Sequence, residues 1–271
     1  MPVITHAEQK LWQRRTTARQ LGIWFSWLCG VALFMYCWQL ISAKTTWYFV
    51  FDAPRIAGDI LSRAVPPRWE YINQLWLPLW DTLNVATLGT IMALVFAVPV
   101  AFLAARNTTP SATFVRPLAL LLIVSSRSIN SLIWALLLVS IVGPGIFAGT
   151  IAIALRSIGF VAKLLYEAIE EIDQAQVEAI SATGASKLQV IAYGIVPQIM
   201  PTFAGVTVFR WDINIRESTV LGLVGAGGIG LQLQASLNVL AWPQVALILL
   251  VIFLAVLVSE WVSAKVRHAI I

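Results

Sequence analysis

Long apolar runs, separated by short polar stretches, make up most of this chain. Each run is close to the roughly 20 residues that an α-helix needs to cross the hydrocarbon core of a bilayer. The pattern therefore predicts an all-α polytopic membrane protein with about six transmembrane helices. The predicted spans are residues 21–41, 77–105, 116–142 and 146–165, a span from Pro197 into a glycine-rich stretch that ends near Gly230, and residues 245–262.

The polar stretches between the runs indicate how the chain is oriented. Residues 1–20 form a basic flank, with a short interfacial helix expected at Leu11 and Trp12, and the residues after the last span are basic too. Lys and Arg gather on the cytoplasmic side of a membrane, and an even number of spans places both termini on one face. We therefore expect cytoplasmic termini. Residues 42–75 are expected to be a periplasmic loop with a short amphipathic helix near residues 54–63.

Composition excludes several classes of protein. The chain is 59% hydrophobic and 11% charged, with a mean hydropathy of +0.83, whereas soluble domains carry roughly 25% charged residues. The net charge of +5 comes from scattered side chains, not from the basic face that nucleic-acid binding needs.

The cysteines do not indicate a disulfide. Cys29 and Cys37 lie about 12 Å apart along a helix axis, too far for a disulfide. No metal-ligand spacing exists, and the first apolar run is long enough to be a retained anchor.

A polar island interrupts the apolar chain between the fourth and fifth spans. An acidic run at Glu167, Glu170, Glu171 and Asp173 precedes the sequence E-A-I-S-A-T-G at residues 178–184. Residues 173–189 are predicted to form a helix whose small side chains let a partner surface approach closely. A glycine at position 184 permits a turn or tight backbone contact. An ordinary amphipathic cytoplasmic loop is the alternative.

A second motif, R-E-S-T-V-L-G-L-V-G-A-G-G-I-G, occupies residues 216–230. Its glycines contain the spacing G-x-G-x-x-G, but a dinucleotide site also needs a preceding strand and an acidic residue about 20 positions later. The flanks here are membrane spans, and residues 245–255 hold no Asp or Glu. Glycines in such a span instead allow close helix contact or a broken helix that lines a cavity.

Charged residues inside the predicted spans form the third constellation. Such residues are costly at membrane depth and often mark a transport pathway. Asp212 and Arg216 are spaced as an i,i+4 ion pair, which has either a structural or a pathway role. Arg127, with Asn130 and Ser131 one turn on, could donate to an oxyanion or lock the helix bundle. The candidates for a pathway are Arg127, Asn130, Ser131, Arg210, Asn214, Arg216, Glu217, Ser218 and Thr219.

These motifs resemble the permease subunits of ABC importers, whose EAA loop has the pattern E-A-A, three residues, Gly, nine residues, then I-x-L-P. Glu178, Ala179, Gly184 and Pro197 match, while Ile180 replaces the third Ala and Gly194 stands where Ile is usual. The glycine motif is similar to the phosphonate branch of this family, in which Tyr-Gly-x-x-Pro is also common. The resemblance extends from about residue 77 to the end. Further matching stretches are Asp81–Leu83, Arg127–Asn130, Gly143–Pro144 with Ala148–Gly149, and Tyr193–Gln198.

The resemblance implies the type I importer permease fold, with residues 76–271 as the permease core and an EAA loop at residues 167–197. It implies a multi-pass, non-catalytic channel subunit of the bacterial inner membrane that needs no cofactor and no metal. The implied partners are two ABC ATPase subunits, a periplasmic substrate-binding protein, a second copy of the chain and membrane lipids, but no nucleic acid. The implied cargo is a phosphonate or a related anion such as phosphite.

Two sets of residues follow from the resemblance. The implied ATPase-coupling residues are Glu178, Ala179, Ile180, Ser181, Ala182, Thr183, Gly184, Ala185, Ser186 and Pro197. The implied gate or packing glycines are Gly222, Gly225, Gly227, Gly228 and Gly230. The alternatives are a permease for another small solute, a secondary transporter and an intramembrane enzyme. A secondary transporter would need inverted repeats or a coupling-ion site, and neither is found. An intramembrane enzyme would need a His or Ser constellation, yet both histidines lie outside the spans.

Overall fold

The computed structural model describes residues 3–6, 9–12 and 17–270, and it divides into two units, one ending at Leu61 and one beginning at Ser62. In the N-terminal unit, β1 (Val3–His6) pairs antiparallel with β2 (Gln9–Trp12). The expectation of an interfacial helix at Leu11 and Trp12 is therefore wrong. Of the basic flank, Arg14 and Arg15 lie outside the described residues.

Two helices follow the hairpin. α1 (Thr17–Lys44) confirms the first predicted apolar helix. α2 (Trp47–Ala64) is amphipathic and longer than the helix predicted at residues 54–63, because it begins in the aromatic stretch before Pro54. Pro54 therefore lies inside the helix, a position that proline usually disfavours.

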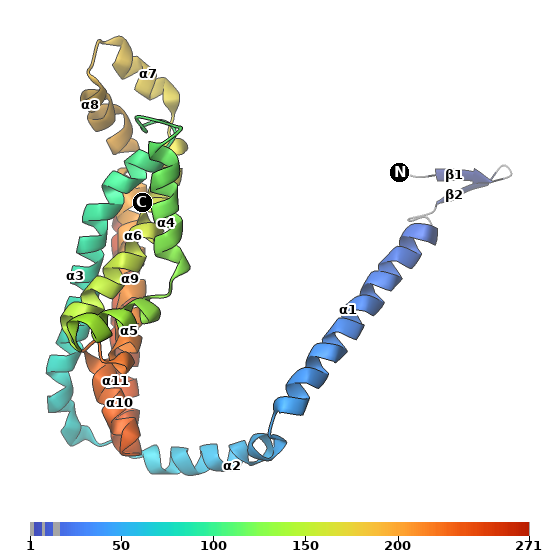
Figure 1. Cartoon of the computed structure of the whole chain (residues 1–271), viewed down its shortest axis with the longest axis vertical. Helices are drawn as coiled ribbons and strands as arrows, with labels where there is room; N and C mark the ends of the chain where they lie inside the picture. The colour runs from blue at the N-terminus through green and yellow to red at the C-terminus, as the bar shows by residue number, and fades with distance from the viewer. Residues whose placement is uncertain (1–2, 7–8, 13–16, 271) are drawn as a thin grey trace. The chain divides into compact units, whose positions relative to one another are not determined.

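Four long helices build the core unit and lie side by side in Figure 1. A short 3₁₀ turn, η1 (Trp69–Tyr71), leads into the first of them. They are α3 (Ile72–Ala104), α6 (Ile146–Glu170), α9 (Val196–Leu221) and α11 (Trp242–Ile270). Residues 72–75, expected in the periplasmic loop, belong to α3. Small buried residues such as Ala97, Ala101 and Ala162 line the contact between α3 and α6, as is usual where helices pack inside a membrane.

The third predicted span is not one helix. α4 (Val115–Ser128) and α5 (Ser131–Val142) meet at an angle of 86°. Ile129 has extended backbone angles, and the Asn130 side chain caps α5 by accepting a hydrogen bond from Leu132 N at 3.2 Å. A capping Asn stabilises a new helix start, which explains why the apolar run breaks there. The described residues contain five helices able to cross a membrane, or six if this bent pair is one span.

The polar island also forms two helices instead of one. α7 (Gln174–Ala182) and α8 (Lys187–Val190) are separated at residues 183–186, where Gly184 has a φ of +83°. Ser186 and Gln189 form a capping box that starts α8. A π-helical turn, η2 (Ile191–Ile195), then leads into α9. Figure 1 shows α7 and α8 projecting beyond the end of the bundle, which we call the loop end.

The opposite end of the bundle carries the glycine motif and is called the glycine end. A 3₁₀ turn, η3 (Gly222–Val224), follows α9. α10 (Ile229–Asn238) follows. We had expected a short loop between Gly230 and the last span, so this helix was not predicted. Thr82 of α3 fixes the start of α10, because its Oγ1 accepts a hydrogen bond from Ile229 N at 2.8 Å. This contact joins segments 147 residues apart, which no local pattern reveals.

Candidate functional site

The surface of α7 at the loop end is available to a partner. Six predicted coupling residues in α7 and in the turn after it are exposed: Glu178, Ala179, Ser181, Ala182, Thr183 and Gly184. A Cβ added at Gly184 would meet no atom within 4 Å, so open space surrounds the turn. Ile180, by contrast, is half-buried and faces inward. A Cβ at Gly194 would lie 3.4 Å from Ile180 Cδ1, an ordinary packing distance, so α7 rests directly on the π-helical turn.

Hydrogen bonds attach α7 to α9. Asp173 caps α7 by accepting a hydrogen bond from Ala175 N at 3.0 Å. Its own backbone N–H donates to Gln198 Oε1 at 2.9 Å, and Gln198 Nε2 donates to Gly194 O at 2.7 Å. One glutamine near the start of α9 therefore holds both the beginning of α7 and the turn behind it.

The acidic run before α7 has a mainly structural arrangement. Glu170 accepts a hydrogen bond from Arg106 N at 2.9 Å and lies 3.4 Å from Arg116 Nη2. Lys163 and Glu167 form an i,i+4 ion pair at 3.5 Å. The contacts of Glu170 tie the end of α6 to Arg106 after α3 and to Arg116 in α4, whereas the Lys163–Glu167 pair lies within α6.

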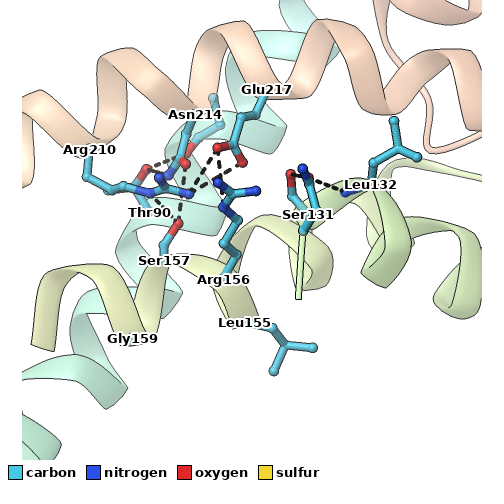
Figure 2. Close-up of polar contacts among 12 residues, drawn as sticks. Thr90, Ser131, Leu132, Leu155, Arg156, Ser157, Gly159, Arg210, Asn214 and Glu217 are labelled. Carbon is cyan, nitrogen blue, oxygen red and sulfur yellow. Dashed lines mark hydrogen bonds and ion pairs between the residues drawn. The ribbon is translucent and has the colours of Figure 1, made fainter. Parts of the chain in front are cut away.

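A buried polar network joins α3, α6 and α9, as Figure 2 shows. Arg210 is only 2% exposed, and its Nε donates to Ser157 Oγ at 2.9 Å. Ser157 Oγ donates to Asn214 Oδ1 at 3.2 Å, and Asn214 Nδ2 donates to Thr90 Oγ1 at 2.8 Å. Networks satisfied in this way make helix packing specific. Arg210 and Asn214, two of the predicted pathway residues, therefore lie inside the protein.

Glu217 connects this network to a second arginine. One of its carboxylate oxygens lies 3.4 Å from Arg210 Nη2, and the other lies 3.6 Å from Nε of Arg156 on α6. Arg210 also lies over the ring of Phe160, with its Cζ 5.1 Å from the ring centroid. The carboxylate is thus shared between a buried arginine and one that is 31% exposed.

A separate set of contacts joins α9 to α11 and α3. Arg216 and the buried Asp212 form the predicted i,i+4 ion pair, and Ser259 Oγ donates to Asp212 Oδ1 at 2.8 Å. Ser218 Oγ donates to Thr82 O at 3.2 Å. Thr219 Oγ1 donates to Arg216 O at 2.7 Å within the helix. Ser218 and Thr219 therefore have helix-stabilising contacts.

An open hollow of about 440 Å³ lies where the break between α4 and α5 faces α6 and α9. Four predicted pathway residues meet there, with Arg156 added. Its polar lining residues are Asn130, Ser131, Arg156, Arg216 and Glu217, and its apolar lining residues are Leu132, Ile213, Val220 and Leu221. We call this space the arginine hollow.

Sequence reasoning missed Arg156 and placed Arg127 more centrally than the structure does. Arg127 is exposed in the last turn of α4, outside the arginine hollow, and no ion pair is found for it among the described residues. Arg156 is the only Lys or Arg between Arg127 and Lys163 in the sequence. A single arginine inside an apolar run could have identified it as a candidate pathway residue.

The glycine motif is a packing device. A Cβ at Gly222 would lie 2.6 Å from Gly230 Cα, and a Cβ at Gly230 would collide with Thr219 O. Gly145 N donates to Gly225 O at 2.9 Å. Gly225, Gly227 and Gly228 all have positive φ, which glycine adopts without a steric penalty. Backbone segments therefore touch one another directly at this end.

Comparisons with known proteins extend these observations. Residues 97–268 match the family model described as binding-protein-dependent transport system inner membrane component. The phosphite transport system permease protein PtxC of Stutzerimonas stutzeri is 39% identical over 263 residues, covering 94% of each chain. The phosphate-import permease protein PhnE of Mycolicibacterium smegmatis is 38% identical over 212 residues, covering 78% of this chain and 40% of that one.

A solved structure shows the same fold. An inward-facing form of the MetNI methionine ABC transporter contains a chain with a TM-score of 0.64 and 19% sequence identity to this one. The match covers 75% of this chain and 99% of the other. The likeness confirms the predicted importer permease fold.

Proposed function

This chain belongs to the family of binding-protein-dependent transport system inner membrane components, the permease subunits of ABC importers, and we propose that its cargo is a small phosphorus oxyanion such as phosphite or a phosphonate. The observation that carries the cargo is the 39% identity to a phosphite permease across 94% of both chains. The arginine hollow supports it, because two partly exposed guanidinium groups line a space between spanning helices. Guanidinium groups bind such oxyanions through paired N–H donors.

The proposed assembly has two copies of this chain, two ATPase subunits and an external substrate-binding protein. Each ATPase docks on an exposed α7, whose small side chains permit close approach. ATP hydrolysis takes place on those partners, so this chain has no catalytic role of its own. Closure of the ATPases brings the two α7 helices together and changes the side from which the pore is open.

The distribution of basic residues supports a cytoplasmic loop end. Arg106, Arg116, Lys163 and Lys187 lie at or near this end. Residues 128–155 and 218–264, which form much of the glycine end, contain no Lys or Arg, and Arg68 is the basic residue next to them, with its backbone N–H donating to Pro243 O. Basic residues concentrate in short cytoplasmic connections. The proposed topology therefore has residues 167–197 and both termini in the cytoplasm and residues 42–75 outside.

Reporter fusions test this topology. Fusions after Ser186 and Ile271 are expected to report a cytoplasmic location, and a fusion after Ala43 an external one. The contrast follows from the basic loop end and from the proposal that the bent α4–α5 pair crosses once, which makes the number of crossings even. An external Ser186 would contradict ATPase docking on α7 and with it the whole assembly.

Uptake by the reconstituted assembly tests the cargo. We expect ATP-dependent accumulation of phosphite or methylphosphonate in vesicles that contain this chain, its ATPase and its binding protein, and none when ATP is omitted. Methionine serves as the comparison solute, because a methionine importer shares the fold. Uptake of methionine with no uptake of either phosphorus compound would assign the chain to a different small-solute importer.

A further inference from the structure

The arginine hollow has an imbalance of charge. Arg156, Arg216 and Glu217 line the hollow, and the buried Arg210 and Asp212 lie behind them as the ion-pair partners of Glu217 and Arg216. Three guanidinium groups share two carboxylates, which gives this cluster a net positive charge. Uncompensated charge at membrane depth is costly, so the cluster favours an anion that enters the hollow.

Two of the three arginines keep donors available to such an anion. A guanidinium group has five N–H donors. The side chains of Arg156 and Arg216 are 31% and 45% exposed, and each has one carboxylate partner. Arg210, by comparison, is buried among Ser157, Glu217 and the Phe160 ring. The open donors of the cluster therefore come from Arg156 on α6 and Arg216 on α9.

Glu217 is placed to exchange one partner for another. Its contact with Arg156 Nε, at 3.6 Å, is longer than a charge-assisted hydrogen bond. Its contact with buried Arg210 does not depend on Arg156. Arg156 can therefore move toward an anion without leaving Glu217 unpaired.

The remaining walls fit an anion that has one group other than oxygen. Leu132, Ile213 and Val220 add apolar side chains to the same lining, and the start of α5 borders this space. The first turn of a helix carries a partial positive charge. An oxyanion with a P–H or P–C bond would place its oxygens toward the arginines and that bond toward the aliphatic side chains.

We propose that the arginine hollow is an anion-binding site inside the permease, where Arg156 and Arg216 bind the oxygens of phosphite or a phosphonate and Glu217 holds Arg156 while the site is empty. This inference rests on the proposed function and adds to it a second point of recognition, distinct from the external binding protein. The binding protein delivers the anion, and the hollow holds it between the two membrane faces.

Ligand stabilisation of the purified permease–ATPase complex, without binding protein, tests the site. A ligand that binds only the folded state raises the unfolding midpoint. We expect the unfolding midpoint of the wild-type complex to be higher in phosphite than in sodium chloride of equal ionic strength. Methylphosphonate should raise the midpoint in the same way. Arg156→Gln should require at least about tenfold more phosphite for the same rise, the loss of one charge-assisted hydrogen bond.

Two further variants make the result decisive. Lys163→Gln removes one positive charge from the same helix, seven residues away and outside the hollow, and should respond to phosphite as the wild type does. Arg156→Lys keeps the charge that pairs with Glu217 but loses the planar fork. Arg156→Lys should assemble normally and still bind phosphite more weakly than the wild type. It therefore tests whether Arg156 binds phosphite even if Arg156→Gln fails to assemble.

The outcomes separate the site from the cargo. If the wild-type assembly imports phosphite but Arg156→Gln and Arg156→Lys show the wild-type phosphite response, the hollow is not the binding site and the inference fails alone. If phosphite stabilises no version of the complex although it is imported, the inference also fails. If the wild-type assembly imports no phosphorus oxyanion, the proposed function fails first.

Discussion

Replacing Gly184 by Trp is expected to abolish transport while leaving the chain in the membrane. Gly184 lies in the exposed turn between α7 and α8, with no atom within 4 Å of the place where a side chain would begin. The bulk therefore enters no core and should not prevent folding. It enters the surface on which the ATPase is proposed to dock. A central interface defect costs about 2 kcal/mol or more, so uptake should fall about 30-fold or more.

The measurement is uptake per assembled complex, together with the amount of ATPase that copurifies with the chain. Because Gly184 has a φ of +83°, any substitution with a side chain also tests backbone strain. Asn tolerates this conformation better than other residues, so Gly184→Asn is the matched control and should keep most of the transport. Normal uptake by Gly184→Trp would show that the turn is an ordinary loop.

Gly230→Ala is expected to have the largest effect on stability. Its added methyl group would collide with Thr219 O and lie close to Gly222 Cα. Both obstacles are backbone atoms, which cannot move aside as a flexible side chain can. Overpacking commonly costs about 1–3 kcal/mol, and we expect the upper part of this range. The unfolding midpoint of the purified complex and the quantity of chain in the membrane should both fall.

Gly205→Ala provides the control for that substitution. Gly205 lies within α9, and a Cβ there would meet nothing within 4 Å. Alanine also favours a helix over glycine, so this variant should be as stable as the wild type or slightly more stable. Equal stability of the two variants would contradict the direct backbone contact between Gly222 and Gly230.

The sequence predicted the spans well because their signal is local. An apolar run of sufficient length specifies a membrane helix whatever its neighbours are, and α1, α3, α6 and α11 confirm this. The break between α4 and α5 was missed because the apolar residues continue across it. Asn130 was interpreted as a polar side chain inside a span, although Asn is also among the strongest helix-capping residues.

The candidate site was only partly predictable for a different reason. The ion pair of Asp212 and Arg216 follows from helix periodicity and was predicted. The shared carboxylate of Glu217 brings Arg156 from α6 to Arg210 on α9, and such contacts between helices depend on packing that a single sequence does not reveal. α10 was missed because its start depends on Thr82, far away in the chain.

The attachment made by Gln198 has a mechanical consequence. Gln198 binds the first residues of the α7 segment at one end of α9, and Arg216 lies eighteen residues further along the same helix. At 1.5 Å per residue the two points are roughly 27 Å apart. α9 is one helix over this length, with Pro201 three residues after Gln198 and no further proline before Arg216. A tilt of α9 at its α7 end would therefore displace the α9 residues that line the arginine hollow. A tilt of α9 by a few degrees would then change the distance between Arg156 on α6 and Arg216 on α9. No rearrangement of the side chains between the two ends of α9 would be needed.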